Sequence, residues 1–115
     1  MAITKNSAKF RKRGDTLEYT PSAAVAAGSL IVVNKLVCLA QWPIAKGEAG
    51  ALKVLQRGEV VEVTVDEALG ATDAGTAIYV TSAGLVTATA TSNTLVGYAA
   101  AAIGANDTTF EVVCA

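Results

Sequence analysis

Apolar and polar positions alternate in short runs along most of this chain, and turn residues separate the runs. In residues 61–66, for example, valines alternate with Glu, Thr and Asp, which is the period of a strand with one buried face. The runs and turns predict strands at 16–20, 29–40 (two strands around Asn34-Lys35), 51–65 (with a bulge or turn at Gly58), 76–81, 85–91, 95–103 and 108–114. Turns at intervals of about eight to twelve residues are typical of sandwiches and barrels. The pattern therefore predicts an all-β fold, a small β-sandwich or barrel of about eight short strands.

Two segments do not follow the strand pattern. Residues 21–28 have the composition of a short helix, with Thr20 as N-cap, Pro21 at the first helical position and Gly28 after the end. Residues 41–50 contain the only Trp, one Pro and two Gly, and are predicted to form a loop. The sequence shows no strict internal repeat.

The length of 115 residues indicates one domain. Hydrophobic residues make up 52% of the chain and aromatic residues only 5%, so the core consists mainly of Ala, Val, Leu and Ile. The most apolar stretch, residues 30–40, is too short for a membrane span and is interrupted by Asn34 and Lys35. No apolar segment of a secretory signal follows the first charges, so we expect synthesis in the cytoplasm. The surplus of apolar residues predicts burial against neighbouring subunits.

The charge is unevenly distributed along the chain. Five of the nine basic residues lie in the first thirteen positions, where no acidic residue occurs; four basic and ten acidic residues follow. We therefore divide the chain into a flexible basic N-terminal arm, residues 1–14, and an all-β domain, residues 15–115. The residues expected to bind a partner in the arm are Lys5, Lys9, Phe10, Arg11, Lys12 and Arg13. Three readings of the arm are open: attraction to nucleic-acid phosphates, docking on an acidic protein surface, or a solvated tail.

The residues needed for common catalytic sites are absent. The chain has no His, no phosphate-binding loop and no nucleophile-elbow motif. Glu59 and Glu62 are expected on opposite faces of a strand, and the other carboxylates on solvated faces or in turns. Cys38 and Cys114 form no metal motif and are predicted to be buried free thiols, although the sequence leaves a disulfide open. We therefore expect no enzyme, cofactor, metal or small-molecule substrate.

Aromatic residues offer one candidate contact. Trp42 lies in the predicted loop between Gln41 and Pro43, where it either anchors a partner or caps one end of the barrel. Tyr79 and Tyr98 lie in predicted strands beside small residues, and we expect each to contact the core or another subunit.

Several short motifs of the predicted domain occur together in a known family. They are A-A-G-S-L-I-V-V at 26–33, L-V-C-L-A at 36–40, I-A-K-G-E-A-G-A-L-K-V at 44–54, G-E-V at 58–60, A-G-T-A-I-Y-V at 74–80, G-L-V-T at 84–87, N-T-L-V-G-Y-A at 93–99 and D-T-T-F-E-V at 107–112. Each motif is weakly specific, but their order over residues 15–114 resembles the capsid cement, or head decoration, proteins of tailed bacteriophages. The basic stretch from Lys9 to Arg13 is not part of the resemblance.

The resemblance implies a structural virion protein that binds the outside of the mature head and stabilises it against the pressure of packaged DNA. The implied partners are the major capsid protein and the chain itself, as a homotrimer, without a membrane. The arm is then expected to lie along an acidic surface of the capsid protein. Two alternatives remain at this point: a nucleic-acid-associated β module that uses the arm, and a carbohydrate-binding or adhesive β-sandwich that uses Trp42 with Tyr79 or Tyr98.

Overall fold

The computed structural model describes residues 15–115, and in this part of the chain it contains strands and turns but no helix. The all-β fold class is confirmed. The strands are β1 (Thr16–Tyr19), β2 (Leu30–Val33), β3 (Leu36–Leu39), β4 (Gly50–Val54), β5 (Val60–Thr64), β6 (Ala77–Val80), β7 (Val86–Thr87), β8 (Thr94–Ala99) and β9 (Thr109–Cys114).

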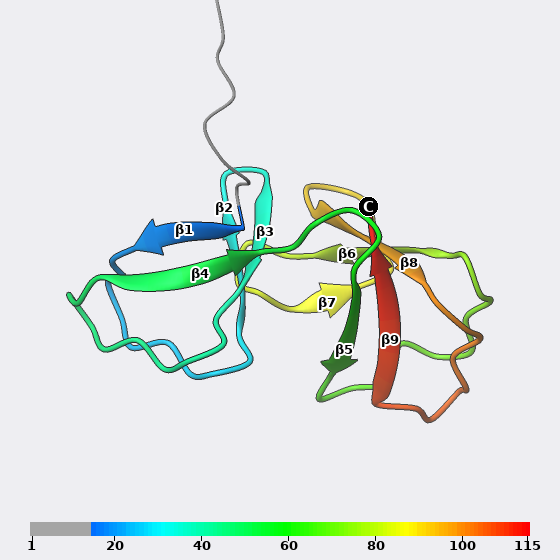
Figure 1. Cartoon of the computed structure of the whole chain (residues 1–115). Coiled ribbons are helices and arrows are strands. Elements are labelled where there is room, and N and C mark those ends of the chain that lie inside the picture. The colour runs from blue at the N-terminus through cyan, green and yellow to red at the C-terminus, as the bar shows by residue number, and fades with distance from the viewer. Residues whose placement is uncertain (1–14) are drawn as a thin grey trace, which may run out of the picture.

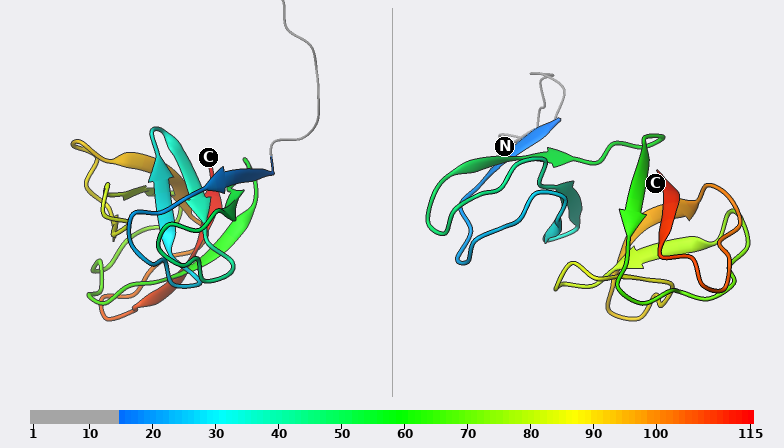
Figure 2. Two further views of the ribbon diagram at one scale, coloured as in Figure 1. Left: turned by 90° about the vertical axis from the view of Figure 1, so that its left-hand side faces the viewer. Right: turned by 90° about the horizontal axis from the view of Figure 1, so that it is seen from below.

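The strands form two antiparallel sheets, one from each half of the described chain. The first has the order β1-β4-β3-β2 and the second the order β5-β9-β8-β6-β7. Figure 1 and the right-hand view of Figure 2 show the two sheets side by side, joined by the segment that runs from the end of β4 into β5. Gly58 lies in this connection, in a turn closed by the bond from the Glu59 N–H to the Gln56 carbonyl. The predicted break at Gly58 is thus a turn between two strands in different sheets.

The predicted helix at 21–28 is wrong. Val25 instead forms an isolated antiparallel bridge with Ile44, in which each backbone N–H donates to the other residue's carbonyl, at 2.8 and 2.9 Å. The Pro21 carbonyl accepts a bond from the Gly47 N–H at 2.9 Å, and the Gly28 N–H donates to the Ala40 carbonyl at 2.6 Å, so both ends of the segment are held by distant backbone. A helix of this length is marginal alone, and these tertiary bonds replace the few that it would make. The predicted 41–50 loop contains the other side of the bridge.

Two predicted strands are shorter in the structure. The segment predicted at 85–91 contains only Val86–Thr87 as a strand, because Thr87 and Thr89 then close a local turn through the Thr87 hydroxyl. The segment predicted at 95–103 ends as a strand at Ala99, and Ile103 pairs instead with Thr72 in a second isolated bridge.

The two sheets repeat one design. The β1-β4-β3-β2 order of the N-terminal repeat (residues 16–54) matches the β5-β9-β8-β6 order of the C-terminal repeat (residues 60–114), which adds β7 at the β6 edge. The bridge of Val25 with Ile44 corresponds to that of Thr72 with Ile103. The bond from the Gly28 N–H to the Ala40 carbonyl corresponds to that from the Gly75 N–H to the Ala99 carbonyl. The chain therefore has an internal pseudo-repeat.

A degenerate sequence repeat accompanies the structural one. Equivalent strands read A-G-S-L-I-V-V at 27–33 and A-G-T-A-I-Y-V at 74–80, and then L-V-C-L-A-Q-W-P-I at 36–44 and L-V-G-Y-A-A-A-A-I at 95–103. The spacing between the two blocks differs because residues 81–94, which contain β7, replace the two-residue turn at Asn34-Lys35. Sequence analysis missed the repeat because this insertion interrupts any fixed period.

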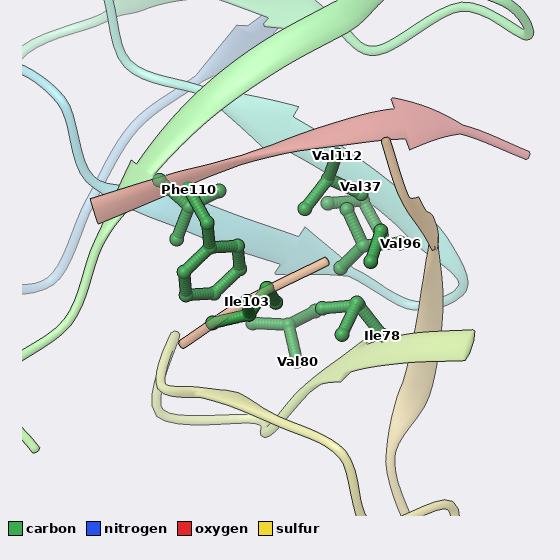
Figure 3. Packing of buried hydrophobic residues seen from close by; sticks show 9 residues of the cluster. Val37, Ile78, Val80, Val96, Ile103, Phe110 and Val112 are labelled. Atoms are coloured by element: carbon green, nitrogen blue, oxygen red, sulfur yellow. The ribbon is translucent and has the colours of Figure 1, made fainter. Parts of the chain in front are cut away.

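The hydrophobic core has two clusters, and the larger belongs mainly to the C-terminal repeat. Figure 3 shows Val37 of β3 packed over this cluster, next to Val96 and Val112. Leu30 and Val32 of β2 pack against the same cluster. The second cluster, in the N-terminal repeat, consists of Cys38, Ala40, Ile44 and Leu52. The β2–β3 hairpin therefore contributes one face to each cluster.

Candidate interaction surfaces

The predicted partner-binding residues of the arm, Lys5 to Arg13, lie outside the described residues. The described chain begins at Asp15, whose carbonyl accepts a bond from the Val54 N–H at 2.9 Å. Asp15 also lines a surface hollow together with Gln41, Arg57 and Glu59. The arm therefore joins the domain near the connection between the two repeats.

This connection is held by an ion pair. The Lys53 ammonium lies 2.8 Å from Oε2 and 3.0 Å from Oε1 of Glu59, and the same Oε1 accepts a bond from the Gln56 N–H at 2.6 Å. Glu59 thus closes the turn that follows β4 and ties it back to that strand. Because Lys53 is 26% and Glu59 36% exposed, water screens the pair, and its contribution is about 1 kcal/mol or less.

Trp42 is 75% exposed, in the loop after β3. Its side chain therefore does not cap the core, which removes one of the two readings made from the sequence. Its role as a partner anchor remains a prediction. Tyr98 belongs to the other repeat, so the described structure gives no single sheet face that carries both residues.

One part of the outer side of the C-terminal sheet is apolar. Val60, Val113, Tyr98 and Ala77 follow one another across four strands as directly opposite partners, and Tyr79 lies opposite Leu95 in the next row. Directly opposite residues project to the same side of a sheet. Val60 is 52%, Tyr98 45% and Leu95 37% exposed, so these side chains are open to solvent. We call this set (Val60, Ala77, Tyr79, Leu95, Tyr98 and Val113) the outer face.

Two carboxylates border the outer face. Glu62 of β5 lies directly opposite Glu111 of β9, and both are exposed. Neither forms an ion pair with any residue from 15 to 115. Like charges directly opposite each other destabilise a strand pair, so a cation supplied from outside the described chain would be favourable here.

Both cysteines are buried free thiols, as predicted. Burial raises the pKa of the Cys38 thiol above the ordinary value of 9.0. Burial is also the main cause of the raised pKa of Cys114, with the Glu59 carboxylate raising it further and Lys53 opposing this. A neutral thiol is a poor nucleophile, and both cysteines are buried, so we describe them as core residues.

No cluster of three or more potential metal ligands occurs within residues 15–115. Nor does that part of the chain contain a helix long and apolar enough to cross a bilayer. The exposed apolar side chains and the Glu62–Glu111 pair described above are features suited to macromolecular contacts. Sequence analysis placed Tyr79 and Tyr98 in the core or in a subunit contact, but it missed the outer face as a whole, because only strand register brings Val60 and Val113 beside Tyr98.

Comparison with known proteins gives one match. A family model described as phage cement protein matches residues 11–114, which includes the last basic residues of the arm, Arg11 to Arg13, and almost all of the β domain. Neither the curated proteins nor the solved structures include a significant match.

Proposed function

The chain belongs to the phage cement protein family, and we propose that it binds the outside of the mature phage head and stabilises the shell against the pressure of packaged DNA. The observation that carries the proposal is the family match over residues 11–114. The family is one of structural phage proteins and implies association with the capsid. The proposed partners are the major capsid protein and further copies of the chain, as a homotrimer made in the host cytoplasm, and catalysis has no part in the function.

Stabilisation of this kind needs only selective binding. A protein that binds the expanded shell and not its dissociated subunits stabilises the shell by mass action. Free protein at a hundred times its Kd contributes about 2.7 kcal/mol per site. Because a head has many equivalent sites, these contributions add up to a large reinforcement.

The arm is the proposed tether. It carries five positive charges without a negative one, whereas the rest of the chain has an excess of acidic residues. An acidic groove or strand edge on the capsid protein would attract it and form charge-assisted hydrogen bonds. Trp42, with its 75% exposed ring beside the loop proline, is the proposed second anchor.

The test is a binding assay with purified undecorated heads. A variant in which Lys9, Arg11, Lys12 and Arg13 are replaced by Gln is expected to occupy heads at least about tenfold less well, since each charge-assisted contact contributes more than about 1 kcal/mol. Occupancy by the unchanged protein is expected to fall as salt rises. Replacement of the exposed Lys35 and Lys46 by Gln is the matched control for loss of positive charge elsewhere.

Equal occupancy by the arm variant at physiological salt would contradict the tether. Loss of DNA binding with unchanged head binding would assign the arm to nucleic acid instead. Failure of the unchanged protein to bind heads at all would contradict the proposed function itself.

A further inference from the structure

The inference starts from the way in which the two repeats contact each other. Leu30, Val32 and Val37 lie on one face of the β2–β3 hairpin, and this face packs on the core cluster of the C-terminal repeat. The opposite face of the hairpin belongs to the core of its own repeat, through Ile31 and Cys38. The side of the β2–β3 hairpin that faces away from its own core thus covers the core side of the C-terminal sheet. Such a contact is head to tail, because it joins two different faces.

Core residues are less exposed in the C-terminal repeat, which the hairpin covers, than in the N-terminal repeat. In the C-terminal repeat, Ile78 and Val80 of β6 are fully buried, at 0% exposure. Their equivalents in the N-terminal repeat, Ile31 and Val33, are only half-buried although they pack on the same kind of core. Val37 belongs to the cluster that contains the first pair, and Figure 3 shows it next to Val96 and Val112 of that cluster. Within residues 15–115 no second hairpin packs on the cluster that contains Ile31 and Val33.

Four residues on the inner face of the N-terminal repeat are buried within the single chain: Cys38, Ala40, Ile44 and Leu52. The other apolar residues that its strands place on this face are partly exposed, and we call them the open face. Its side chains are half-buried except Leu36, which is 47% exposed and shares the Cys38 side of β3 by strand alternation. The open face consists of Leu17, Tyr19, Ile31, Val33, Leu36 and Val54.

The other unmatched surface is the outer face of the C-terminal repeat. Its residues correspond to those that form the intramolecular cover: Ala77 and Tyr79 take the places of Leu30 and Val32. A register shift after Ile78 places Leu95 opposite Tyr79, where Val37 lies opposite Val32 in the first repeat. Within residues 15–115 this face covers no other core, and Val60, Leu95 and Tyr98 on it are exposed.

We propose that the outer face of one copy covers the open face of the next copy, repeating between molecules the contact that joins the two repeats within one. The occupant of the open face is thus a second copy of this chain. The open face corresponds to the surface that is covered in the contact between the two repeats, and the outer face corresponds to the surface that covers it. Both are apolar, which suits the core of a subunit interface.

A contact between two different faces is heterologous, and it closes into a ring when the rotation between copies divides a full turn. In a trimer the ring would contain six repeats. The inference therefore deepens the proposed self-association, by naming the faces that join. It is tested in solution without capsids, so its failure would leave capsid binding untouched.

Mixing two variants tests the head-to-tail arrangement. Tyr98→Glu places a charge in the outer face and Leu36→Glu places one in the open face; both positions are solvent-exposed in the single chain, so folding is preserved. We expect the unchanged protein to sediment as a closed oligomer and each variant as a single copy. A mixture of the two variants retains one intact pair of faces and is expected to give dimers and nothing larger. Leu85→Glu, at a 63% exposed site outside both faces, is the control and is expected to keep the full mass.

The proposal is overturned if the unchanged protein is a single copy at every concentration used, if either variant keeps the full oligomeric mass, or if the mixture gives no dimer. A second measurement does not depend on disrupting the contact. Val37 packs in one cluster with Val80. Leu95 lies opposite Tyr79 as Val37 lies opposite Val32, and Val33 is the equivalent of Val80, so Leu95 and Val33 are expected to meet between copies. A mixture of Leu95→Cys and Val33→Cys chains is expected to form a covalent heterodimer on mild oxidation, and Leu95→Cys with Leu85→Cys is not. Absence of the first cross-link counts against the proposal.

Discussion

At the scale of single residues, close contacts between neighbouring strands restrict which side chain fits. Gly97 is the clearest case: a Cβ on this residue would overlap the Val113 carbonyl of the neighbouring strand. The residue equivalent to Gly97 in the N-terminal repeat is Cys38, which is fully buried. The two repeats therefore differ at this site: Cys38 has a buried side chain, whereas the Val113 carbonyl leaves no room for one at Gly97.

The buried thiols give a prediction at this scale. Since the folded protein raises the pKa of Cys38 and Cys114, it holds their protons more tightly than the unfolded chain does. This contribution to stability is fully present below the unfolded pKa and is lost as pH rises through the raised folded value. We expect the free energy of unfolding in urea to fall as pH rises above about 9, the ordinary thiol value. The Cys38→Ala, Cys114→Ala double variant is expected to show a flatter dependence; an identical slope would contradict the assignment.

At the scale of elements, the β2–β3 hairpin is the part on which both cores depend. Val37→Ala removes two buried methyl groups from the larger cluster, and the loss is expected to cost about 2 kcal/mol of folding free energy in urea unfolding. Leu85→Ala, at a 63% exposed site, is the control, with an expected effect below about 0.5 kcal/mol. If the two variants unfold at the same urea concentration, the hairpin does not stabilise the C-terminal repeat.

The elements also show what sequence can and cannot predict here. Alternation located strands with one buried face, such as β5 and β9, whereas β2 and β3, which contact a cluster on each side, were located from a continuous apolar run. The turn at Gly58 was predicted from its glycine alone. The 21–28 segment was predicted as a helix because local propensity ignores the distant partner Ile44. Composition and periodicity contain no information on which strand lies beside which, so the outer face and the open face were found only from strand register. The capsid role came from the order of several weak motifs, and the family match bears it out.

At the scale of the whole molecule, the two repeats pack on each other, and each also has an apolar face that the other does not cover. The open face of the first repeat and the outer face of the second are apolar, and in a ring of copies each would be buried. The carboxylates of Glu62 and Glu111 would remain at the border of the contact. They are therefore available to a cation from another chain, whether the arm of a neighbouring copy or a basic segment of the shell.

The central claim is that the protein reinforces the phage head, and the most direct measurement is the temperature at which DNA-filled heads release their DNA, with and without the protein. We expect decorated heads to release DNA at a higher temperature, and the difference to grow with free protein concentration until the sites are filled, because the protein acts as a ligand of the intact shell. Equal release temperatures for bare heads and for heads shown to be fully occupied would contradict the account.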